Sequence, residues 1–102
     1  MSTDLEELVR CISRFSGHLR ELVPATDQWE VRVEDLRDPE TETRPVQVVM
    51  VRFRRRVGER VLAGMQMLSP LLLTDAIALD AVAEHVAKQW AHQARTAEDI
   101  VA

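Results

Sequence analysis

Hydrophobic positions follow two different periods along this chain, and the period changes between residues 23 and 29. From residue 4 to residue 22, apolar side chains recur at spacings of three and four, which predicts an amphipathic helix over 4–22 that ends before Pro24. From Trp29 the period becomes two, because Trp29, Val31 and Val33 alternate with charged residues. This alternation predicts a strand over 29–36 with one buried face.

The charged, turn-rich segment RDPETETR links this strand to a second one, predicted over 46–57, and the two form an antiparallel hairpin. The register should align the two apolar faces, because a shift of one residue would turn every side chain to the other face. The facing apolar pairs would be Trp29 with Phe53, Val31 with Val51, and Val33 with Val49. On the reverse face the same register places Glu30 opposite Arg52, a favourable cross-strand pair.

The segment VGER at 57–60 predicts a hairpin into a third strand over 60–68. Gly58 in the first central position suits a two-residue type II′ turn. The apolar pattern of Val61, Met65 and Met67 fits a three-residue loop better, so the two indications differ by one residue, and a bulge would reconcile them.

A closing helix is predicted over about 70–95. Ser69-Pro70 and Thr74-Asp75 are both suitable helix starts. The order helix, strand, strand, strand, helix predicts an α+β fold with a three-stranded antiparallel meander. We expect both helices on one sheet face and the other face partly open.

Length and composition are those of one soluble domain spanning 1–102, with 46% hydrophobic and 29% charged residues. The longest apolar stretch, LSPLLLTDAIAL, is interrupted by Pro70 and Asp75 and is too short for a membrane span, so we expect no membrane partner. The N-terminal residues lack the order of a secretory signal, which predicts a cytoplasmic protein. Cys11 is the only cysteine and is expected to be a small buried hydrophobe.

Charge is distributed unevenly. The net charge is −5 over residues 1–45, +4 over 46–68 and −3 over 69–102. The basic segment contains RFRRRVGER, and its end extends beyond the shorter first strand, which predicts a protruding arginine-rich β-hairpin. The candidate partner-binding residues are Arg52, Arg54, Arg55, Arg56 and Arg60, with the acids Glu40 and Glu42 as complementary residues on a neighbour.

Three interpretations of these arginines remain open. They can form a solvated hairpin neutralised by Glu30, Glu34 and Glu59 of the same molecule. They can contact an acidic surface on another copy or another protein, where guanidinium groups form bidentate pairs with carboxylates. They can also bind phosphates of a nucleic acid, although aromatic residues make up only 4% of the chain and its pI is about 5.3.

Residues with catalytic or metal-binding chemistry are sparse. His85 and His92 lie seven residues apart, whereas zinc ligands on a helix are usually three to five apart, and no cysteine pair is present. No glycine-rich phosphate loop or nucleophilic triad pattern occurs. We therefore expect no enzyme, metal or cofactor.

The sequence favours a non-catalytic assembly or interaction module, acting as a homo-oligomer or as a small structural component of a larger particle. Parts of phage virions and acidic assembly chaperones are analogous in size, charge and architecture. The alternative is a small nucleic-acid-associated regulator that uses the same arginines on phosphates.

Overall fold

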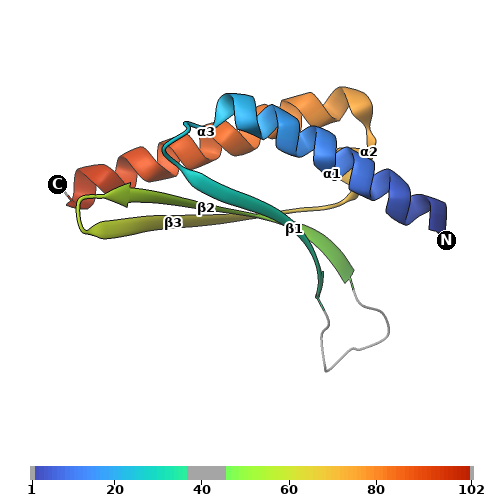
Figure 1. Cartoon of the computed structure of the whole chain (residues 1–102), viewed down its shortest axis with the longest axis horizontal. Helices are drawn as coiled ribbons and strands as arrows, with labels where there is room; N and C mark the ends of the chain where they lie inside the picture. Colours follow the sequence, from blue (N-terminus) through green and yellow to red (C-terminus); the bar gives the residue numbers. More distant parts are fainter. Residues whose placement is uncertain (1, 37–45, 102) are drawn as a thin grey trace.

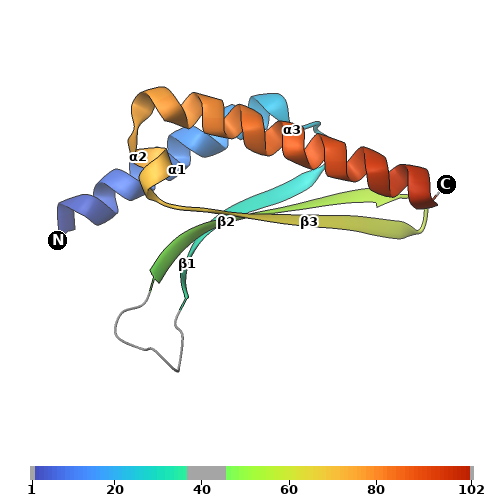
Figure 2. The same ribbon diagram turned by 180° about the vertical axis from the view of Figure 1, so that it is seen from behind.

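The computed structural model describes residues 2–36 and 46–101. In chain order the elements are α1 (Ser2–Leu22), β1 (Gln28–Leu36), β2 (Val46–Val57), β3 (Arg60–Leu68), α2 (Leu71–Thr74) and α3 (Ala76–Val101). The sheet is antiparallel with the order β1-β2-β3. Both long helices lie on one of its faces, and none of the described residues covers the other, which we call the open face (Figures 1 and 2). The predicted α+β meander is confirmed.

The strand register is the one that the apolar alternation predicts. Trp29 lies opposite Phe53, and Glu30 lies opposite Arg52 on the other face. The predicted pairs of Val31 with Val51 and of Val33 with Val49 are also present. The register is fixed because residues 49, 51 and 53 are fully buried beneath the helices, and a one-residue shift would expose all three.

The hairpin between β2 and β3 has the two-residue turn. Val57 pairs with Arg60, and Gly58 is the only described residue with positive φ, at 62°, which agrees with a type II′ turn. Pairing then continues without a bulge as far as Leu68. The apolar pattern of β3 therefore gave the wrong loop length, because its apolar residues Val61, Met65 and Met67 face the open side rather than the core.

The core lies between β2 and the two long helices. Its fully buried side chains are Phe15 and Leu19 from α1, Val49, Val51 and Phe53 from β2, Leu73 from α2, and Leu79, Val86 and Trp90 from α3. Full burial of a Val, Leu or Phe side chain contributes about 1.5–3 kcal/mol. Cys11 is half-buried and packs against this core.

The closing helix is two helices, not the single helix predicted over 70–95. Both candidate starts are used: α2 follows Pro70, and α3 follows Asp75, whose extended backbone (φ −91°, ψ 111°) separates the two. The Asp75 carboxylate accepts hydrogen bonds from the backbone N–H groups of Ile77, at 2.9 Å, and Ala78, at 3.4 Å. From there α3 runs back over the sheet to Val101.

The distal end of the hairpin extends past β1, because the last pair between β1 and β2 joins Gln28 to Arg54. Its helix-facing side is nevertheless covered, since the C-terminal part of α3 lies along it (Figure 1). Gly64 makes this close approach feasible: a Cβ at this position would lie 2.7 Å from Cζ3 of Trp90. Arginines on the helix-facing side of β2 therefore lie beneath α3, whereas those on the other side lie on the open face.

Candidate functional site: the open face of the sheet

Arg55 lies on the helix-facing side of β2 and forms a buried ion-pair network. Its Nε and Nη2 donate to Oδ1 and Oδ2 of Asp27, both at 2.8 Å, and its Nη1 donates to Oε1 of Glu98 at 3.0 Å. Trp90 donates from Nε1 to Oδ2 of Asp27 at 2.8 Å and stacks on Phe53, with ring centroids 5.1 Å apart. The network joins the α1–β1 turn, β2 and α3.

Asp27 is held in place by the turn that precedes β1. Its backbone N–H donates to the carbonyl of Pro24 at 2.9 Å, and its side chain is fully buried. Burial alone would raise the pKa of the Asp27 carboxyl, but the hydrogen bonds from Arg55 and Trp90 and the charge of Arg55 outweigh it, so this pKa lies below its ordinary value. The hydrogen bond to Asp27 raises the pKa of Arg55 despite its burial. Both groups are therefore charged at neutral pH.

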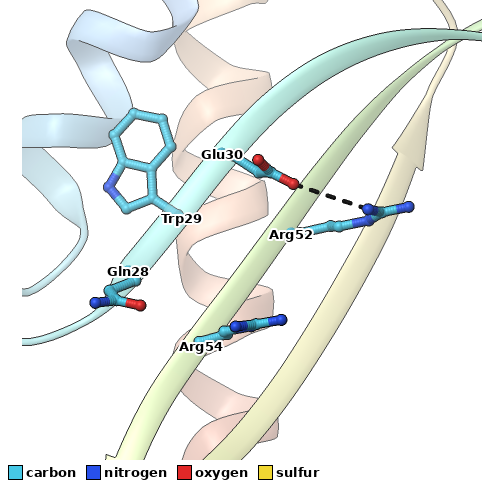
Figure 3. Close-up of a pocket in the computed structure, with 5 residues that line it drawn as sticks. All are labelled: Gln28, Trp29, Glu30, Arg52 and Arg54. Carbon is cyan, nitrogen blue, oxygen red and sulfur yellow. Dashed lines mark ion pairs between the residues drawn. The ribbon is translucent and has the colours of Figure 1, made fainter.

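Arg52, Arg54 and Arg56 lie on the opposite side of β2, on the open face, because successive side chains of a strand point to opposite faces. Arg52 lies 3.8 Å from Oε1 of Glu30 and 3.5 Å from Oε1 of Glu34. Such exposed pairs contribute only about 0–1 kcal/mol. Figure 3 shows Arg52 and Arg54 extending from β2 in the same direction, with Glu30 directed toward Arg52.

Arg54 and Arg56 are exposed, and neither forms an ion pair within residues 2–36 and 46–101. Arg54 lines three shallow, solvent-open hollows. One, of about 320 Å³, lies beside Gln28 and Arg52 (Figure 3). A second, of about 190 Å³, lies between Arg56 and Val61, and a third, of about 370 Å³, includes Ala63 and Met65.

Apolar side chains of β3 lie next to these arginines on the open face. Val61 is 58% exposed, Met65 51% and Met67 54%. Arg54 pairs with Ala63 and Arg56 with Val61, so the basic and apolar rows are adjacent. Single exposed apolar residues are common on protein surfaces, but a row of them beside unpaired arginines is typical of an interaction surface. We call Arg54, Arg56, Val61, Met65 and Met67 the open-face patch.

The structure thus divides the arginine cluster that the sequence presents as one unit. Arg52, Arg54 and Arg56 are together on the open face, whereas Arg55 is engaged in the core network. Arg60 is exposed at the turn and shares the helix-facing side with Arg55. The two acids proposed as complementary residues, Glu40 and Glu42, lie outside the described residues.

Asp27 and Glu98 are functional partners of Arg55 that the sequence did not indicate. They lie 28 and 43 residues away from it, beyond the reach of any local pattern. One indication was available: Arg55 has the same strand parity as Val49, Val51 and Phe53, so alternation alone places it on the buried face.

The histidines do not come together. His18 lies 2.7 Å from Oδ1 of Asp80 between α1 and α3, whereas His85 and His92 line a shallow hollow on α3. In the part of the chain that the structure describes, no group of three or more His, Cys, Asp or Glu side chains could hold a metal ion. Over the same ranges, no helix combines the length and apolar character that a bilayer span requires.

Comparisons with known proteins return no match: no protein-family model, curated protein or solved structure resembles this chain. Its function is therefore inferred from the geometry alone.

Proposed function

We propose that this protein is a non-catalytic protein-interaction module whose open-face patch binds an acidic and partly apolar protein surface. The supporting observation is that Arg54 and Arg56, which form no ion pair with any residue in 2–36 or 46–101, lie beside the exposed apolar row of β3. Arginine and methionine are both enriched at protein interfaces. Guanidinium groups form bidentate pairs with carboxylates, and methionine side chains adapt to an irregular partner surface.

The rest of the open face favours a protein partner over a nucleic acid. Glu30 and Glu34 pair with Arg52 on this face, so among the described residues only Arg54 and Arg56 of β2 are left without an ion pair, fewer than the roughly 6–10 phosphate contacts of a nucleic-acid-binding surface. Three of the four aromatic residues, Phe15, Phe53 and Trp90, are buried in the core, and the fourth, Trp29, is half-buried against it, so the sheet lacks the row of exposed rings on which successive bases stack.

The same surface suits a small component of a larger assembly. Opposite charges concentrated in different segments of one chain favour ordered contacts between copies or with an acidic neighbour. The proposal therefore includes a structural or assembly role in a particle, among which phage virion parts are one analogy.

A peptide-binding measurement tests this proposal. A fluorescent peptide of about 16 residues, built from Glu and Leu, is titrated with the protein, and its anisotropy is followed in about 0.05 M and 0.5 M salt. The test variant is Arg54→Glu with Arg56→Glu. Its control is Arg10→Glu with Arg20→Glu, which makes the same change in net charge on exposed positions of α1.

We expect the wild type and the α1 control to bind alike, and the open-face variant to bind at least about tenfold more weakly, which corresponds to about 1.4 kcal/mol. Added salt should weaken binding of the wild type. Equal affinities for the two variants would refute the proposal. A duplex RNA or DNA of about 20 base pairs serves as the competing ligand: binding of the duplex, but not of the peptide, through Arg54 and Arg56 would assign the patch to nucleic acid.

A further inference from the structure

A second exposed apolar surface lies where α2 meets α3. Leu71 is 79% exposed, Ile77 89% and Leu72 44%, whereas Leu73 between them is fully buried. The extended backbone of Asp75 separates the two helices. The local fold does not need these side chains, because Leu73 alone anchors α2 in the core. We call Leu71, Leu72, Asp75 and Ile77 the corner patch.

The corner patch complements the open-face patch in charge. It combines apolar side chains with the carboxylate of Asp75, and it lies in a segment with a net charge of −3. Only Oδ1 of Asp75 accepts hydrogen bonds within the described ranges, and Asp75 is exposed, so Oδ2 is available to a guanidinium. The open-face patch combines apolar side chains with Arg54 and Arg56 in a segment with a net charge of +4. The basic, apolar open-face patch therefore matches the acidic, apolar corner patch as a binding partner.

Within one molecule the arginines of the open-face patch lie far from the corner patch, although Met67, at the other end of the apolar row, lies only four residues before Leu71. The molecule is elongated, with extents of 48 × 35 × 17 Å. In both overall views α2 lies near the N-terminal half of α1, whereas the β2–β3 turn lies at the opposite end beside the C-terminus of α3 (Figures 1 and 2). Arg54 and Arg56, close to that turn, therefore lie too far from Asp75 of the same molecule to pair with it.

We infer that the partner of the open-face patch is the corner patch of a second copy of this chain. This inference rests on the proposed function, because it uses the same patch. The shallow hollow beside Ala63 and Met65 joins apolar side chains to Arg54, so Ile77 of the second copy would pack on it while the Asp75 carboxylate pairs with Arg54 or Arg56. Because two different surfaces meet, the contact is head-to-tail and propagates into a closed ring or an open filament.

Two variants test the inference because each removes one surface. The first, the sheet variant, is Arg54→Glu with Met65→Glu, and the second, the corner variant, is Leu71→Lys with Ile77→Lys. All four positions are exposed, so both variants should fold, which circular dichroism verifies. Ile100→Lys is the control, because this residue is 80% exposed but belongs to neither patch. Mass is measured by light scattering across a concentration series.

The wild type and the Ile100→Lys control should form species that grow with concentration, whereas each patch variant alone should remain at the chain mass of 11.6 kDa. An equimolar mixture of the two variants retains one competent pair of surfaces. It should therefore form a species of twice the chain mass and nothing larger. A symmetric interface elsewhere, such as pairing through the free edge of β3, would survive in both variants and would overturn the inference.

A wild type that stays monomeric at every concentration, or a mixture of inactive variants that fails to associate, would also overturn it. The peptide experiment separates this failure from failure of the proposed function. If the acidic peptide still binds through Arg54 and Arg56 while the wild type is monomeric, the open-face patch recognises a different protein.

Discussion

The sharpest prediction concerns Asp27, whose replacement by alanine should destabilise the fold strongly. The side chain accepts three hydrogen bonds, two from Arg55 and one from Trp90, all at 2.8 Å. Removing it leaves the indole N–H of Trp90 without a partner and deprives Arg55 of its main counter-charge. The three elements that meet at this carboxylate lose their common contact.

The magnitude follows from the burial of the pair. Removing one member of a buried ion pair costs about 3–5 kcal/mol, and an unpaired buried donor costs about 1–3 kcal/mol. The side chain of Arg55 is 19% exposed and keeps Glu98 at 3.0 Å, so part of its charge stays compensated. We therefore expect a loss near the lower limit, about 3 kcal/mol in the free energy of unfolding.

Urea denaturation followed by tryptophan fluorescence measures this loss. With a slope of about 1–1.5 kcal/mol per molar urea for a small domain, the midpoint should fall by about 2–3 M. The double variant Asp27→Ala with Arg55→Met leaves no buried unpaired charge and should be at least as stable as Asp27→Ala alone. A loss below about 1 kcal/mol for Asp27→Ala, or effects of the two substitutions that add within about 0.5 kcal/mol, would refute this reasoning.

Three further predictions use the same denaturation assay. Gly64→Ala should destabilise the fold by about 1–3 kcal/mol, because its Cβ would lie 2.7 Å from the Trp90 ring. Gly17→Ala should instead stabilise α1 by about 0.5–1 kcal/mol, because nothing lies within 4 Å of the new Cβ. Equal effects of the two substitutions would contradict this packing. Gly58→Ala should destabilise by about 1–2 kcal/mol because φ at this position is +62°, and a neutral effect would argue against the type II′ turn. Because the pKa of Asp27 is lowered in the folded state, the stability that its carboxylate contributes is present above about pH 4 and is lost as the pH falls through the folded pKa. The free energy of unfolding, measured from about pH 7 to about pH 2.5, should therefore fall less steeply for Asp27→Asn than for the wild type.

The sheet could be predicted from the sequence because one of its faces is buried. Val49, Val51 and Phe53 share one strand face with Trp29, Val31 and Val33 of β1, and the helices above them leave only one register that buries all three β2 residues. The strands at 46–57 and 60–68 have the predicted bounds, because the glycine of the two-residue turn at 58–59 marks where one ends and the other begins. The broken closing helix was less accessible, since Pro70 and Asp75 are each a good helix start and the sequence does not show that both are used.

On β3, by contrast, the apolar pattern predicted the wrong loop length and the wrong face. Val61, Met65 and Met67 look like a core-facing row, yet the turn at Gly58 places them on the open face. A local turn preference prevailed over apolar burial, which leaves the apolar row exposed beside Arg54. Departures from the local rules of folding tend to occur at functional surfaces, where exposure of apolar side chains has a use.

Strand alternation also decides how the arginines can be tested. Reversing the charges of Arg54, Arg55 and Arg56 together would place a carboxylate at position 55, facing Asp27 and Glu98. That variant would lose oligomers or ligand binding because the hairpin no longer packs against α3, whichever partner the protein has. Arg54 and Arg56 have no such internal partner among the described residues, so their replacement changes the surface charge alone. Among the three consecutive arginines, only Arg54 and Arg56 can therefore separate binding from folding, as their position on the other face of the strand from Arg55 requires.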